Sequence, residues 1–262
     1  MTLIVRPGYG GAAVSDPDAQ AYLQAVEVAD NQALEQGVQQ AVNQFVIGCK
    51  ADGIWTAIKA SCILAGARTL AGALVPLVGT APTNNNFVSG DYNRETGLGD
   101  ASNTTKYLNS NRTGVADPQN NHHLAVYATT ANTNASSVYI GGENAYRNTI
   151  YGDVTASIAV SLRQDAVGLT GRPINGTGLI AGSRSASNLV NWRVSGNSGT
   201  FSTGSDSDTY PSIFVYGRNS GGTNGNYSNA RIAFYSIGES LDLALLDARV
   251  TALITAFGVA IP

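Results

Sequence analysis

The side chains best suited to chemistry in this sequence are tyrosines beside loops rich in asparagine and glycine. A binding site for a small polar ligand commonly combines an aromatic wall with a few hydrogen-bonding side chains, and sugar rings suit such a site. Most tyrosines of a β-rich protein instead lie in the core or at an interface, with a hydrated hydroxyl. The tyrosines in this setting are Tyr139, Tyr146, Tyr151, Tyr210 and Tyr227, and the last four are the predicted glycan contacts.

Hydrolysis of a glycosidic bond would require two carboxylates on one face of a sheet, about 5–5.5 Å apart for retention or about 6.5–9.5 Å apart for inversion. Such a pair lies two positions apart in one strand or on adjacent strands. The carboxylates lie mostly in or beside turns: Asp91, Glu95, Asp100, Asp117, Glu143, Asp153, Asp165, Asp206 and Asp208. A glycoside hydrolase is therefore the least favoured function, and no catalytic residue is predicted.

The residue types that could bind a metal ion do not form a strong motif. Adjacent strand residues point to opposite faces, so His122 and His123 cannot easily bind one metal ion and are predicted to be a polar pair at a strand edge. Calcium stays open as an alternative, with ligands from Asp206 and Asp208 or from Asp91 and Asp100, but solvated acidic loops are favoured. We therefore predict no metal and no cofactor.

The charge composition excludes some partners. The 262 residues carry a net charge of −3, with only 13% charged residues, about half of the usual share. Nucleic-acid binding requires clustered lysine and arginine, which are absent here. A largely neutral polar surface suits subunit packing or carbohydrate contact. The sequence thus predicts no nucleic-acid partner.

The sequence also bears on export, membrane insertion and disulfide formation. The apolar run at the N-terminus is too short for a signal peptide. Residues 60–79 have the length of a membrane span, but they contain Arg68 and Pro76, so a packed helix is favoured. Cys49 and Cys62 lie in apolar contexts and are predicted to be free buried thiols, with a disulfide left open.

The N-terminal third is expected to form a helical base beneath the β domain that would carry any site. We expect an extended arm over residues 1–15 and a helical module over residues 16–79. Asp16 followed by Pro17 is typical of a helix start. A second helix follows, and Asp52 caps a third; the alanine-rich segment to Val75 either continues the third helix or forms a fourth, and Pro76 ends it.

From residue 80 to residue 238 the pattern changes to about ten short β runs separated by Gly, Asn and Ser turns, which is typical of a sandwich or barrel. The run RIAFYSI is expected to be the last core strand, in a sheet that begins near Thr105. Residues 239–262 form a C-terminal helix capped by Ser240 or Asp242. Its predicted buried face comprises Leu243, Leu246, Val250, Leu253, Ile254 and Phe257. Both chain ends would then form one helical base, with any recognition at the opposite loop rim.

Several stretches resemble known families. TKYLNSNR, SIFVYGRN and ARIAFYSIGESLDLALLDARV resemble strands of the concanavalin A-like, laminin-G-like jelly roll. The fold class implied is α+β: an N-terminal helical module, a β-sandwich jelly roll and a C-terminal helix. Residues 18–112, with the distinctive words GCKADGIWTAIKASCILAGA and FVSGDYNRETGL, resemble a segment of structural proteins of tailed bacteriophages, including cyanobacterial ones.

The second resemblance implies a virion component. The favoured function is a non-enzymatic structural protein on the particle surface, either a capsid decoration protein or a tail component, held by the arm and helical module. Its partners would be other virion proteins and copies of itself, with no membrane. The alternative is a lectin-like adhesin of a tail fibre that binds host surface glycan. Head or tail location and oligomeric state stay open.

Overall fold

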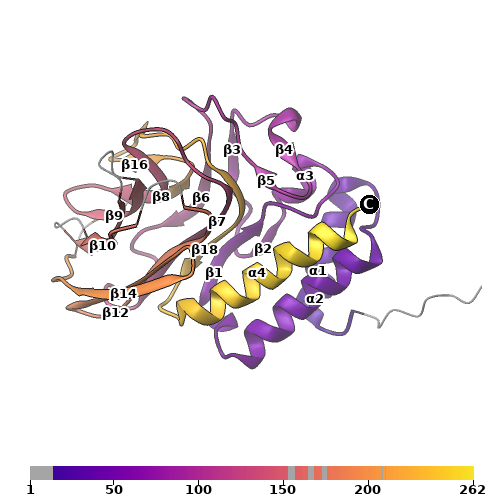
Figure 1. Cartoon of the computed structure of the whole chain (residues 1–262), viewed down its shortest axis with the longest axis horizontal. Coiled ribbons are helices and arrows are strands. Elements are labelled where there is room, and N and C mark those ends of the chain that lie inside the picture. Colours follow the sequence, from indigo (N-terminus) through magenta and orange to yellow (C-terminus); the bar gives the residue numbers. More distant parts are fainter. Residues whose placement is uncertain (1–13, 153–156, 165–167, 173–175, 208, 210) are drawn as a thin grey trace, which may run out of the picture.

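Two β-sheets pack face to face in the computed structural model of the chain, and helices cover the outer face of one of them (Figure 1). The structure describes residues 14–152, 157–164, 168–172, 176–207, 209 and 211–262. The predicted class is confirmed: an α+β chain with a β-sandwich and a C-terminal helix. The predicted arm falls on residues 1–13, outside the described residues, and on Val14 and Ser15.

The helices begin where the sequence provides caps. Asp16 accepts hydrogen bonds from the backbone N–H groups of Asp18 and Ala19, and Asp242 caps the C-terminal helix in the same way. Both predicted caps are confirmed. The helical elements are α1 (Pro17–Asp30), α2 (Gln36–Ala51), η1 (Trp55–Ala57), α3 (Leu70–Ala73), η2 (Ser89–Asp91) and α4 (Leu243–Ala260).

Sheet A is the sheet that the helices cover. Its main strands follow the order β14-β13-β12-β7-β18-β1-β2, and β4 and β5 attach beside β18. All its strand pairs are antiparallel. Its strands are β1 (Ile58–Ile63), β2 (Pro76–Val78), β4 (Tyr92–Asn93), β5 (Gly97–Leu98), β7 (His122–Thr130), β12 (Gly178–Ala186), β13 (Leu189–Val194), β14 (Asn197–Ser202) and β18 (Arg231–Gly238).

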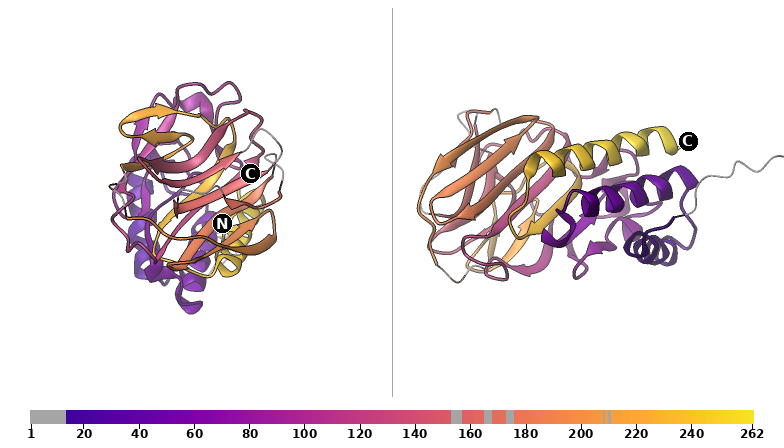
Figure 2. Two further views of the ribbon diagram at one scale, coloured as in Figure 1. Left: turned by 90° about the vertical axis from the view of Figure 1, so that its left-hand side faces the viewer. Right: turned by 90° about the horizontal axis from the view of Figure 1, so that it is seen from below.

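Sheet B lies on the far side of the sandwich from the helices (Figure 2). Its main order is β11-β10-β9-β8-β15-β6-β3, and β16 adds to β8 in parallel. Its strands are β3 (Thr83–Asn85), β6 (Tyr107–Thr113), β8 (Ser137–Glu143), β9 (Arg147–Gly152), β10 (Ile158–Gln164), β11 (Gly168–Leu169), β15 (Ser212–Val215), β16 (Arg218–Ser220) and β17 (Thr223–Gly225).

The predicted helical structure over residues 52–75 is wrong apart from the short helix α3. After the short turn η1, residues 58–63 form β1, which lies inside sheet A between β18 and β2. Ala60 and Cys62 face the sandwich interior, whereas Ile58 and Ile63 face the helices. A strand buried on both faces reads as a continuous apolar run, and periodicity alone cannot distinguish it from a buried helix.

This strand also corrects the predicted boundary and the predicted sheet. The helical part of the N-terminal third is residues 17–51, and β1 and β2 belong to the sandwich. The last strand, β18, pairs with β1 and β7 in sheet A, whereas the strand near Thr105 is β6 of sheet B. Cys49 in α2 and Cys62 in β1 are free and buried, and burial raises the pKa of each thiol to about 12.

Two hydrophobic cores result from this layering. One fills the space between the sheets, and the other lies between sheet A and the helices. In the second core, Phe234 of β18 meets Phe45 of α2 edge to face, with ring centroids 5.7 Å apart. The predicted buried face of α4 is confirmed at Leu243, Leu246, Val250, Leu253 and Phe257, while Ile254 is half-buried.

Two ion pairs attach α4 to the rest of the chain. Arg193 of β13 bonds to Asp247 with an Nε–Oδ2 distance of 2.6 Å, and Arg249 bonds to Asp52 at the end of α2 at 2.7 Å. The helix therefore crosses the outer face of sheet A and continues along α2 (Figure 1). Helices α1 and α2, which precede the sandwich, and α4, which follows it, form one helical layer, as the sequence predicts.

Candidate functional site

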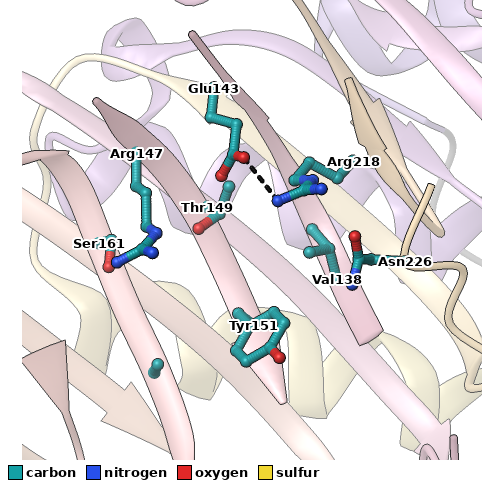
Figure 3. A pocket seen from close by; sticks show the side chains of 9 residues that line it. Val138, Glu143, Arg147, Thr149, Tyr151, Ser161, Arg218 and Asn226 are labelled. Atoms are coloured by element: carbon teal, nitrogen blue, oxygen red, sulfur yellow. Dashed lines mark hydrogen bonds and ion pairs between the residues drawn. The ribbon is translucent and has the colours of Figure 1, made fainter. Parts of the chain in front are cut away.

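A recess of about 320 Å³ opens on the outer face of sheet B, which turns away from the helical layer. The strands β8, β9, β10 and β16 supply most of its walls (Figure 3). We call this recess the sheet B pocket. Its described lining residues are Val138, Glu143, Arg147, Thr149, Tyr151, Ala159, Ser161, Arg218 and Asn226.

Strand alternation places the polar side chains. In β9, Ile150 belongs to the core between the sheets, so its neighbours Thr149 and Tyr151 turn to the outer face. In β10, Val160 lies in the same core and Ser161 turns outward. The pocket is therefore built on paired strands, which hold its side chains more firmly than loops would.

A bulge in β8 shapes one wall. The register with β9 shifts between Val138 and Ile140, so Tyr139 is the extra residue. Tyr139 is fully buried in the core, and it therefore cannot serve as an exposed sugar platform. Gly141 is also required, because a Cβ at that position would lie 2.6 Å from Cγ2 of Thr149.

Charge is concentrated at one end of the pocket. Nη1 of Arg218 bonds to Oε1 of Glu143 at 2.5 Å, and Arg147 is the strand partner of Glu143 across β8 and β9. Figure 3 shows the two arginines on either side of Glu143, with Tyr151 farther along the same face. The Nε atom of Arg218 is buried and has no hydrogen-bond partner among the described residues. Two guanidinium groups thus share the lining with one carboxylate.

A second recess of about 330 Å³ adjoins the first and shares Asn226 with it. Tyr227 lines this second recess and lies 6.4 Å from Tyr107, measured between ring centroids. Tyr107 in turn stacks on Phe214 at 4.5 Å. Burial, and then the nearby Tyr107, raise the pKa of the Tyr227 hydroxyl. An aromatic row therefore extends the polar pocket toward the Asn-rich loops.

The four predicted glycan contacts have different outcomes. Tyr151 and Tyr227 line the two neighbouring recesses. Tyr146 is half-buried between β8 and β9 and is not among the described lining residues of either recess. Tyr210 lies outside the described residues.

Sequence reasoning missed the arginines. Arg147 and Arg218 meet at one pocket only because β9 and β16 both adjoin β8. A signal existed for part of the site, since the segment RNTIYG places Arg147, Thr149 and Tyr151 on one face by its period of two. No local pattern indicated that Arg218 would join them.

The described lining provides one carboxylate, Glu143, which Arg218 holds in an ion pair. Two-carboxylate chemistry would need a second acid in the pocket, and the described lining offers none. Asp153 and Asp165 lie outside the described residues, as does Asp208.

The calcium alternative is not supported at Asp91 and Asp100. The ammonium group of Lys106 lies 2.7 Å from Asp91 and 2.8 Å from Asp100, so a cation of the chain already occupies these carboxylates. Bonding to Lys106 lowers the pKa of Asp100, and the two carboxylates raise the pKa of Lys106. Within the part of the chain that the structure describes, no group of three or more His, Cys, Asp or Glu residues could hold a metal ion.

The prediction that the histidines form a strand-edge pair is wrong. Both lie in β7, which has neighbours on either side in sheet A, and both are buried. His123 Nδ1 donates to the carbonyl oxygen of Glu239 at 2.5 Å, and its Nε2 accepts from the hydroxyl of Ser236 at 2.7 Å. These contacts make His123 a structural link between β7 and the end of β18.

Comparisons with known proteins give no family. No protein-family model matches the chain, and no curated protein matches it. The similar solved structures include the leech intramolecular trans-sialidase complexed with 2,7-anhydro-Neu5Ac, at 14% identity and a TM-score of 0.37; the match covers 54% of this chain and 24% of that one.

Two further solved structures match part of the chain. The Ruminococcus gnavus IT-sialidase CBM40 bound to α2,3-sialyllactose has 12% identity and a TM-score of 0.38, covering 50% of this chain and 82% of that one. The botulinum neurotoxin serotype D binding domain has 14% identity and a TM-score of 0.48, covering 75% of this chain and 51% of that one. At these TM-scores none of the matches carries an argument about function, and the fold rests on the strand order described above.

Proposed function

We propose that this protein is a non-enzymatic, lectin-like domain that binds a saccharide on the outer face of sheet B. One observation carries the proposal: the sheet B pocket combines the ring of Tyr151 with hydrogen-bonding side chains from several strands. Small-ligand sites typically enclose about 300–1,000 Å³ and combine an apolar wall with a few placed polar groups. The pocket, at about 320 Å³, fits one or two sugar units rather than a long chain.

The lining also favours one class of saccharide. Guanidinium groups bind carboxylates through two parallel hydrogen bonds, which are stronger than bonds between neutral groups. Arg218 and Arg147 flank the pocket; Glu143 bonds to Nη1 of Arg218, whose Nε is buried without a hydrogen-bond partner among the described residues. An acidic sugar that bears a carboxylate should therefore bind more tightly than its uncharged counterpart.

The test uses the full chain and two probes that differ in charge. Oligogalacturonides and neutral galacto-oligosaccharides are titrated by calorimetry and by NMR line broadening. We expect millimolar-to-micromolar binding, with the oligogalacturonides bound more tightly. Tyr151→Ala should weaken binding about tenfold or more, because it removes the ring that faces the sugar. Tyr146→Ala is the matched control and should leave affinity unchanged.

Three outcomes would contradict these statements. If neither probe nor a panel of host cell-wall polysaccharides binds, the lectin function is wrong. If both probes bind equally, the preference for acidic sugars is wrong while the lectin function stands. Release of reducing sugar during the titration would contradict the non-enzymatic assignment.

We propose as a second function that the domain is a structural component of a bacteriophage particle, in a capsid decoration or a tail, attached through its helical layer. The sequence resemblance supports this, and so does the uncharged exposed surface of α4. The backbone N–H groups of Ser15 and Asp16 both donate to Oδ1 of Asn43, which fixes the end of the predicted arm on α2. Deleting residues 1–13 should reduce incorporation into particles without changing the melting temperature, and unchanged incorporation would contradict a role for the arm.

A further inference from the structure

Helix α4 carries a second apolar stripe on the side that faces away from sheet A. Successive members are three and four residues apart, and all are exposed. Leu245 is 36% exposed and Val259 is 85% exposed. We call this stripe the α4 seam, and it comprises Leu245, Ala248, Ala252, Thr255 and Val259.

The composition of α4 does not match its burial in one chain. Its mean hydropathy of 1.7 makes it the one helix among the described residues that is long and apolar enough to span a membrane. Yet only 33% of its residues are buried. A helix that is apolar on all sides is normally covered on all sides. Among the residues that the structure describes, nothing covers this exposed side of α4.

No unpaired charge adjoins the seam on α4. Its charged residues are Asp247 and Arg249, which bond to Arg193 and Asp52. Helices that lie on a membrane surface usually carry several Lys or Arg residues along their polar face. In α4 the single basic residue is already held by a carboxylate, so the seam suits a neutral protein surface better than a lipid surface.

A shallow groove of about 340 Å³ lies beside the seam, between α2 and α4. Figure 2 shows these two helices side by side, extending away from the sandwich. Small residues line much of the groove, including Gly37, Ala41 and Ala256. Gly37 allows the close approach of the two helices, because a Cβ there would lie 2.7 Å from Cβ of Ala260. Small side chains allow another helix to lie close against this surface.

We propose that the α4 seam and this groove form the interface between two copies of the chain, with α4 antiparallel to the α4 of the second copy. Apolar residues spaced alternately three and four apart are the pattern by which one helix packs along another. Arg249, which lines the groove, is paired with Asp52, so the face carries little net charge for a two-fold axis to bring together.

The distribution of side-chain size along the seam fits an antiparallel pair. Leu245 and Val259 each lie seven residues from Ala252. An axis at Ala252 therefore places Leu245 of one copy near Val259 of the other, with small residues between them. The large side chains fill the ends, and the small ones allow the helix axes to approach.

The available area indicates that α2 takes part. An 18-residue helix is about 27 Å long, and two helices side by side present a face on the order of 500 Å². Stable interfaces bury about 800 Å² on each partner, so α4 alone, with about half of the two-helix face, is insufficient, and α2 and α4 together form a small interface. We therefore expect a weak, reversible dimer with a dissociation constant of roughly micromolar order.

Sedimentation of the full chain over about 1 to 200 µM tests the interface, since mass action makes the dimer fraction depend on concentration. We expect the mass to rise from monomer to dimer. Ala252→Arg should leave a monomer at every concentration, because it places two guanidinium groups across the axis. Val88→Arg is the matched control: Val88 is 58% exposed and lies off the helical layer. Melting curves should show that both variants fold.

Cysteine crosslinking tests the orientation. Leu245→Cys and Val259→Cys proteins are mixed and oxidised with copper phenanthroline. An antiparallel pair gives the mixed disulfide, whereas a parallel pair gives the two homodisulfides. The native Cys49 and Cys62 are fully buried and should not react.

Several results would overturn the proposal. A chain that stays monomeric across the concentration range overturns it, and so does a dimer that survives Ala252→Arg. Homodisulfides alone overturn the antiparallel arrangement. Flotation of the protein with phosphatidylcholine vesicles, abolished by Ala252→Arg, would instead assign this face to a membrane. None of these results depends on whether a saccharide binds to sheet B.

Discussion

The outer faces of the two sheets differ although both belong to one sandwich. Sheet A presents Ala125, Leu179, Ala181, Ala233 and Phe234 to the helices. Sheet B turns Arg147, Thr149 and Ser161 to its outer face at equivalent alternate positions, where they line the sheet B pocket. The residue type at every second position thus decides which sheet must be covered and which can hold a polar pocket.

This difference explains why a β-sandwich chain carries helices at both ends. Strands such as β7 and β18 are apolar on both faces, so water must be excluded from each. The helices α1, α2 and α4 supply that cover for sheet A. The same helices leave sheet B open, and the two proposed binding surfaces therefore lie on opposite sides of the molecule.

The largest expected effect is on the covered side. Phe234→Ala removes a fully buried ring between sheet A and α2, and it should lower the free energy of unfolding by about 3–5 kcal/mol. Tyr107→Ala on sheet B removes a half-buried ring and should cost only about 1 kcal/mol. Guanidinium chloride unfolding measures both. Equal losses would show that the helical cover contributes no more than the open face.

The next effect is a pH dependence that belongs to sheet A. Burial lowers the pKa of His123 to about 4, whereas an unfolded histidine titrates near about 6.5. The unfolded chain therefore binds the proton first, and stability present above about pH 6.5 is lost as pH falls toward 4, by up to about 3 kcal/mol. Burial also lowers the pKa of His122 in the same strand, so His123→Gln should reduce this dependence between pH 7 and 4.5, and the double variant with His122→Gln should flatten it in unfolding curves. A variant with the slope of the wild type would show that other groups cause it.

The smallest expected effect is on the open side. Arg218→Gln breaks the pair with Glu143, in which the arginine side chain is 32% exposed. Exposed pairs contribute about 0.2–1 kcal/mol, so the free energy of unfolding should fall by less than about 1 kcal/mol. Affinity for oligogalacturonides should fall at least fivefold in the same variant. A loss of stability above about 2 kcal/mol would mean that the pocket is part of the core instead.

Local patterns predicted much of the fold. The Asp16-Pro17 pair and Asp242 mark helix starts because capping needs only residues adjacent in the chain. The turn spacing after residue 80 predicted short strands for the same reason. The pattern misled at residues 58–63, where an apolar run on both faces has no period that separates strand from helix.

The candidate site was predicted only in part. Tyr151 and Tyr227 were identified from their setting, whereas Tyr139 has the same setting and lies in the core because of the bulge in β8. Whether a strand tyrosine points inward or outward depends on register, and a shift of one residue reverses it.

The sequence by itself determined the helix caps, the short strands and the two apolar stripes of α4, because each depends on neighbours within a few positions. Only the tertiary structure decided that β1 enters sheet A, that Arg147 and Arg218 meet beside Glu143, and that one stripe of α4 remains exposed. These outcomes depend on pairing between segments far apart in the chain, where the free energy of burying whole faces outweighs local preference.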